Sequence, residues 1–211
     1  MDWQALHERK RDRYESGVER LQPEQLVRMG NAAYASGLSL LMLGRAGAAR
    51  AWLARAAERW RESWEHATPT SWGRPIGTIK ASLVADDDEE ARRYAEWALG
   101  LGPAEAESPI GRYAATLALL VLGRWEDAAR LAETVRGRDD FPPAVADALA
   151  SIAAGDPAGY ADAAARVVAS FEAREEYLED VPVADTALAL HALARRRGLE
   201  VVLPASSVLP G

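Results

Sequence analysis

The sequence predicts an all-α protein made of stacked antiparallel helical hairpins. Apolar residues recur at a period near 3.6 along almost the whole chain, with no period-two run long enough to require a sheet. Alanine dominates the apolar residues while valine and isoleucine are sparse, which favours helix over strand. Sharp turns recur at spacings of 42, 37 and 32 residues, as in helical repeats. We therefore expect about ten helices in one helical-repeat domain spanning residues 1–211.

Five helices are expected in the first half of the chain. The N-terminal helix lies in residues 1–22, and its inward stripe includes Lys10. Pro23 suits the first turn of the second helix, which ends at Gly44. A third, tryptophan-rich helix stops at the break TPTSWGRP. The fourth helix begins near Pro75, and the acidic run ADDDEE suits the first turn of the fifth because it complements the helix macrodipole.

Five more helices follow in the second half. The sixth starts at SPIG, RWEDAARLAETVRG forms the seventh, and FPP opens a short eighth. We expect the ninth to continue through Glu172, Glu176 and Glu179, which would share one solvated face. A proline precedes the tenth, whose last turn holds three arginines. The repeat hairpins thus span residues 23–181, and residues 182–211 supply a capping helix and an extended tail.

Four turns are followed by the same pattern of residues. Gly44, Asp86, Gly123 and Gly155 each precede small or apolar residues at offsets of five, nine and twelve. In a helix these three positions form one narrow stripe, and small residues there let the preceding helix approach closely. The twelve stripe positions are Ala49, Leu53, Ala56, Ala91, Ala95, Ala98, Ala128, Ala132, Val135, Tyr160, Ala164 and Val167.

The tripeptide PIG occurs twice, 34 residues apart, at residues 75–77 and 109–111. We expect each proline to lie in the first turn of a helix and each isoleucine to point inward. The glycines, Gly77 and Gly111, would leave room for a neighbouring element. The spacing indicates a repeat register and not a duplicated active-site loop.

These units resemble the tetratricopeptide repeat, a 34-residue helix-turn-helix module. The segment GRWEDAARLAETV has Gly123, Trp125 and Ala128 at positions that the repeat prefers, and Gly37 falls where its first helix carries a glycine. The resemblance covers residues 23–170 and departs from the pattern in unit length and in the missing tryptophan before the first-helix glycine. It implies a right-handed superhelix that binds a protein or peptide without catalysing a reaction.

A second resemblance is to the all-helical immunity proteins of bacterial polymorphic toxin systems. A tryptophan-rich early helix precedes a P-x-G helix and an acidic helix start, and the tail ends near a proline. This resemblance implies an alternative function, a bacterial immunity protein that neutralises one toxin. Only Lys10 and Lys80 of the 25 basic residues are lysine, which is typical of GC-rich coding.

No motif for catalysis, metal or nucleotide binding is present in the sequence. His7, His66 and His191 lack the spacing of a helical metal site, and there is no EF-hand, phosphate loop or nucleophile elbow. We therefore expect no catalytic residue, no metal and no cofactor. A small-ligand binder or an enzyme of unknown class is the second alternative, because a closed polar pocket is not visible in a sequence.

The composition limits the classes of partner and the cellular location that we expect. A net charge of −7 argues against nucleic acid, since the arginines would have to concentrate locally against the overall field. No apolar run approaches the roughly 20 residues of a membrane span, and the first residues do not form a secretory signal, so a cytoplasmic location is expected. Cysteine is absent, which excludes disulfides and thiolate sites. Whether the terminal hairpins are capped by the tail or by another copy in a homo-oligomer stays open.

A partner-binding surface is expected where the first helices of adjacent units meet. First helices line the concave surface in such repeats, and an aromatic floor with two or three cations suits an acidic or carboxylate-terminated peptide. The tryptophans are open to two interpretations, core between hairpins or floor of the groove. The candidate residues for contacting a protein or peptide partner are Trp64, Trp72, Arg74, Lys80, Arg112 and Tyr113.

Overall fold

A computed structural model describes residues 1–19 and 22–211 and confirms the all-helical prediction. Residues 20 and 21, within the expected N-terminal helix, lie outside the described residues. The described part of the chain contains ten α-helices and no strand. The helices are α1 Trp3–Val18, α2 Pro23–Met42, α3 Ala46–Ser63, α4 Gly73–Val84, α5 Asp88–Gly100, α6 Pro109–Val121, α7 Trp125–Glu133, α8 Pro143–Ala154, α9 Pro157–Glu172 and α10 Asp185–Arg197.

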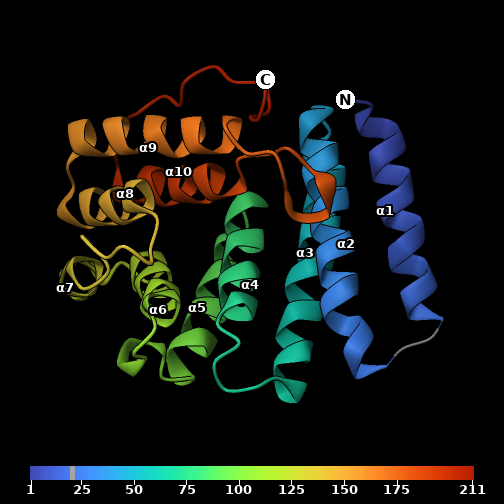
Figure 1. The fold of residues 1–211 in the computed structure, drawn as a ribbon, viewed down its shortest axis with the longest axis horizontal. Helices are drawn as coiled ribbons and strands as arrows, with labels where there is room; N and C mark the ends of the chain where they lie inside the picture. Colours follow the sequence, from blue (N-terminus) through green and yellow to red (C-terminus); the bar gives the residue numbers. More distant parts are fainter. Residues whose placement is uncertain (20–21) are drawn as a thin grey trace.

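Consecutive helices pack against one another as stacked hairpins (Figure 1). The hairpins pair α2 with α3, α4 with α5, α6 with α7, and α8 with α9, and each also contacts the next hairpin along the chain. Helix α10 does not extend the stack. It lies across α4, α6 and α8, the first helices of three successive hairpins, and also contacts α9. None of the described helices has the length and apolar character needed to cross a membrane.

The four repeat turns share one backbone conformation. Gly44, Gly123 and Gly155 have φ values of 71°, 71° and 73°, and Asp86 at the equivalent turn has 54°. A left-handed residue at this place ends a helix, and glycine adopts it without strain. All twelve residues of the predicted stripes are at most 2 % exposed. The repeated pattern therefore reports both the turns and the close-packed face that follows each of them.

A tryptophan side chain packs against the glycine of each PIG segment. A Cβ placed on Gly77 would lie 2.8 Å from Cε3 of Trp60, and one on Gly111 would lie 2.9 Å from Nε1 of Trp72. Both prolines lie in the first turn of their helices, as expected. The inward direction expected for both isoleucines is wrong for Ile110, which is 41 % exposed.

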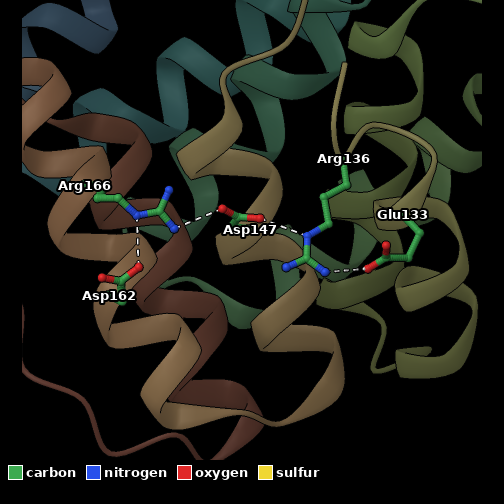
Figure 2. A network of polar contacts seen from close by, with 5 residues as sticks. All are labelled: Glu133, Arg136, Asp147, Asp162 and Arg166. Carbon is green, nitrogen blue, oxygen red and sulfur yellow. Dashed lines mark hydrogen bonds and ion pairs between the residues drawn. The ribbon is translucent and has the colours of Figure 1, made fainter. Parts of the chain in front are cut away.

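A chain of ion pairs crosses α7, α8 and α9 on the molecular surface (Figure 2). Asp147 on α8 accepts hydrogen bonds at 2.9 Å from Arg136, which follows α7, and from Arg166 on α9. Arg136 also pairs with Glu133 at 3.0 Å, and Arg166 with Asp162 at 3.0 Å. Burial raises the pKa of Asp147, but the two arginines outweigh it and hold that pKa below its ordinary value.

The ninth helix ends earlier than the sequence predicts. It stops at Glu172, and residues 173–184 form an irregular segment, here called the strap, that reaches across to the α1–α2 hairpin. The expectation that Glu172, Glu176 and Glu179 share one solvated helical face is wrong. Glu179 instead pairs with Lys10 of α1, and both side chains are buried. The chain therefore leaves the helix after Glu172, and Glu179 forms a charge-assisted hydrogen bond with Lys10, which is 169 residues away in the sequence.

Candidate functional site

A cavity of about 390 Å³ lies where α2, α3 and α4 meet the strap and the start of α10. Its size falls at the lower end of the range for ligand cavities. The walls combine apolar side chains with a few convergent polar groups. They are formed by Val27, Asn31, Tyr34, Trp60, Ser71, Gly73, Arg74, Ile76, Gly77, Lys80, Leu178 and Asp185.

One wall of the cavity is a network of hydrogen bonds around Asp185. The Lys80 ammonium lies 2.7 Å from Oδ2 of Asp185 and donates to Oγ1 of Thr186 at 2.9 Å. The hydroxyl of Tyr34 donates to the same carboxylate oxygen at 3.0 Å. The network joins α2, α4 and the first turn of α10, where a carboxylate is also favoured by the helix dipole. It fixes the place at which α10 begins on the stack.

Two tyrosines beside this wall stay neutral over a wide pH range. Burial, together with the charge of Asp185, raises the pKa of Tyr34 well above its ordinary value. Burial and the same charge also raise the pKa of Tyr113. The Tyr113 hydroxyl is buried and has no hydrogen-bond partner among the described residues. Neither phenol is therefore prepared to act as a base.

Arg74 supplies the cavity with a charge that is not neutralised. Its Nη1 donates to the carbonyl oxygen of Ser63 at 2.6 Å, and no carboxylate of the described residues forms an ion pair with it. Burial lowers its pKa, as expected for a partly desolvated guanidinium without a counter-ion. Lys80 and Asp185 offset each other, so the ionisable residues of the wall leave one positive charge in excess. The cavity thus favours an anionic group although the whole chain is acidic.

The floor of the cavity is the indole of Trp60. This side chain is 6 % exposed, its Nε1 donates to Oδ1 of Asn31 at 3.0 Å, and its ring lies 5.1 Å from that of Tyr34. Gly30 of α2 and Gly77 of α4 both contact the indole at positions where a Cβ would clash. The Trp60 indole can occupy this position because Gly30 and Gly77 have no side chains.

A second, smaller cavity of about 50 Å³ shares Asn31, Tyr34, Leu178 and Asp185 with the first. The strap contributes five of its lining residues. They are Arg174, Tyr177, Leu178, Val181 and Val183. The strap is thus part of the wall of both cavities.

The structure separates the six residues proposed from the sequence. Arg74 and Lys80 both line the larger cavity. Trp64 and Trp72 pack against each other with ring centroids 5.6 Å apart, and neither lines that cavity. Arg112 donates to the carbonyl oxygen of Ala106 at 3.0 Å, and neither Arg112 nor Tyr113 lines the larger cavity.

Sequence reasoning missed Asn31, Tyr34 and Asp185, which line the same cavity as Arg74 and Lys80. Asn31 and Tyr34 belong to the second helix, which was interpreted only for its apolar stripe. A signal for Asp185 exists only in hindsight, because an acidic residue in a first helical turn normally serves the helix itself.

His7 and His191 are partly buried, and His66 is exposed. Nδ1 of His7 shares a hydrogen bond with the Ser36 hydroxyl at 2.7 Å, and burial lowers the pKa of His7. Burial also lowers the pKa of His191, with a smaller effect from Arg195. Within residues 1–19 and 22–211, no group of three or more histidine and carboxylate side chains is placed to hold a metal ion.

Comparisons with protein-family models, with curated proteins and with solved structures found no match to this chain.

Proposed function

We propose that this protein is a non-catalytic interaction module of the tetratricopeptide-repeat-like type, whose hairpins form a right-handed superhelix. Its partner is a protein or peptide segment that carries a carboxylate, bound at the cavity between α2 and α4. The observation that carries the proposal is the unpaired guanidinium of Arg74 in a cavity with an aromatic floor.

The position of α10 supports this function. It lies across the first helices of three hairpins, so that surface has the shape to receive a helical chain. Its residues Ala187, Leu190, Leu193 and Ala194 are at most 1 % exposed, which makes α10 part of the core and not an exchangeable occupant. A partner is therefore left the part of this surface that α10 does not cover, at the cavity between α2 and α4.

Charge complementarity supports an acidic partner segment. A carboxylate at Arg74 would satisfy guanidinium donors that have no acceptor among the described residues, in surroundings partly shielded from water. Trp60, Ile76 and Leu178 provide apolar contacts beside it. The Lys80–Asp185 pair would orient the segment without adding net charge.

The test is a selection of random peptides displayed with free C-termini on the purified protein. Enriched peptides are synthesised and their dissociation constants measured by fluorescence polarisation. We expect enrichment of carboxylate-bearing peptides and at least tenfold weaker binding to Arg74→Ala, because a charge-assisted contact is removed. Arg92→Ala is the matched control, since Arg92 is exposed on α5 and does not line the cavity. A selection without enriched peptides, or one whose peptides bind Arg74→Ala as well as the unchanged protein, contradicts the proposal.

A further inference from the structure

The strap contains two adjacent residues in an unfavourable backbone conformation. Glu179 has φ 57° and ψ 26°, and Asp180 has φ 58°. Residues with a side chain rarely occupy this left-handed region, and two in succession are rarer still. Such strain persists only where surrounding contacts impose it.

The contacts that impose it come from α1. Oε2 of Glu179 lies 2.9 Å from the Lys10 ammonium and 2.7 Å from Nη1 of Arg13. The Lys10 and Glu179 side chains are only 9 % and 8 % exposed, while Arg13 is half exposed. Lys10 is the inward-facing lysine of the α1 stripe, and Glu179 is its counter-ion. Because both charges are removed from water, neither can lose its partner without a large penalty.

The same segment forms one wall of the smaller cavity. Val181 and Val183 are 3 % and 2 % exposed and form its inner wall, whereas Leu178 is 57 % exposed at the margin of both cavities. A long apolar side chain held at a cavity margin gains burial once a ligand or a rearrangement covers it. Displacing the strap would join the two cavities beside Tyr34.

We propose that the strap is a lid over the smaller cavity, which adjoins the binding cavity, and that Glu179, held by Lys10 and Arg13, is its latch. The strained backbone at Glu179 and Asp180 favours opening of the strap. The ion pairs of Glu179 with Lys10 and Arg13 favour closure, so the two effects oppose each other. A partner that competes for Lys10 or Arg13 shifts this balance toward the open form. The role of the lid in partner binding rests on the proposed function. The movement itself can be measured without any partner.

A thiol probe measures the opening, since the chain has no cysteine of its own. In a Val181→Cys protein the single thiol lies on the buried inner face of the strap and reacts with a disulfide reagent such as Ellman's reagent only when the strap opens. We expect Glu179→Gln to raise the reaction rate at least tenfold. Glu176→Gln, an exposed neutral replacement in the same segment, is expected to leave the rate unchanged. High salt is expected to raise the rate in the Val181→Cys protein, because Arg13 is half exposed.

A second probe separates lid opening from general loss of stability. Val121→Cys places a thiol at the end of α6, where Val121 is 4 % exposed. The lid predicts that Glu179→Gln accelerates labelling at residue 181 and not at residue 121. Equal acceleration at both sites, or none at residue 181, overturns it. If Glu179→Gln does not fold, Arg13→Ala gives the same comparison through the exposed half of the latch. A failed peptide selection leaves this measurement unaffected.

Discussion

The left-handed turn after the first helix of each hairpin allows the backbone cost of the repeat to be measured directly. Asp86 occupies a place that glycine holds in the other three turns, and its side chain forms no hydrogen bond or ion pair with the described residues. A residue with a Cβ in this conformation costs about 1–2 kcal/mol, and glycine loses about 0.5–1 kcal/mol through its greater freedom in the unfolded chain. Asp86→Gly should therefore stabilise the protein by about 0.5–1 kcal/mol.

The reciprocal change has a matched control three residues away. A Cβ on Gly44 or on Gly47 would meet no atom within 4 Å, so packing does not contribute at either place. Gly44 has φ 71°, whereas Gly47 lies in α3 with ordinary helical geometry. Gly44→Ala should cost about 1 kcal/mol through backbone strain, while Gly47→Ala should gain up to about 1 kcal/mol through helix propensity.

Urea unfolding followed by circular dichroism at a helical wavelength measures all three variants. For a chain of this length 1 kcal/mol corresponds to about 2–4 °C in Tm, which thermal unfolding resolves. Opposite signs for the two glycine variants are the decisive result. If Gly44→Ala and Gly47→Ala change the free energy of unfolding in the same direction, the conformational account of the repeat turns is refuted.

Three further outcomes are expected. Gly77→Ala should destabilise the protein by about 1–2 kcal/mol in urea unfolding, because the methyl group meets the Trp60 ring at 2.8 Å and overpacking outweighs the gain in helix propensity. Asp147→Asn should cost about 1 kcal/mol at pH 7, where the lowered pKa of this carboxyl stabilises the folded state. The cost should vanish as the pH falls below the ordinary value of 3.8 and through the lower folded pKa, which parallel unfolding curves at pH 7 and pH 3 can check. Lys80→Met should cost about 2–4 kcal/mol by stranding Asp185, and adding Asp185→Asn should recover part of that loss in a double-mutant cycle.

The features that could be predicted from the sequence are those carried by local patterns. The turns at Gly44, Asp86, Gly123 and Gly155 and the small residues after them follow from helical periodicity and from the preference of glycine for a left-handed turn. The room at Gly77 is also predictable, because glycine has no side chain. The identity of the occupant, Trp60, is not, because the two residues lie on different helices and no pattern in the sequence links them.

The candidate site was predicted only in part because its members are distant along the chain. The sequence predicts Arg74 and Lys80 as cations on a first helix, but Thr186, which accepts from Lys80, is 106 residues further on. The end of α9 was missed for a related reason. An acidic run such as that around Glu176 is compatible with a solvated helix. The ion pair between Glu179 and Lys10, which favours a non-helical path here, depends on a residue far away in the sequence.

The polar groups of the cavity divide into those that maintain the fold and one that is free to bind. Tyr34, Lys80 and Asp185 satisfy one another and attach α10 to the stack, so replacing any of them changes stability together with the shape of the site. Arg74 has no such task beyond its bond to the Ser63 carbonyl oxygen. An experiment that reduces binding through Lys80 would therefore be ambiguous. A loss of affinity in Arg74→Ala with an unchanged free energy of unfolding would assign recognition to this side chain, because no other cation in the wall of the larger cavity lacks a carboxylate partner among the described residues.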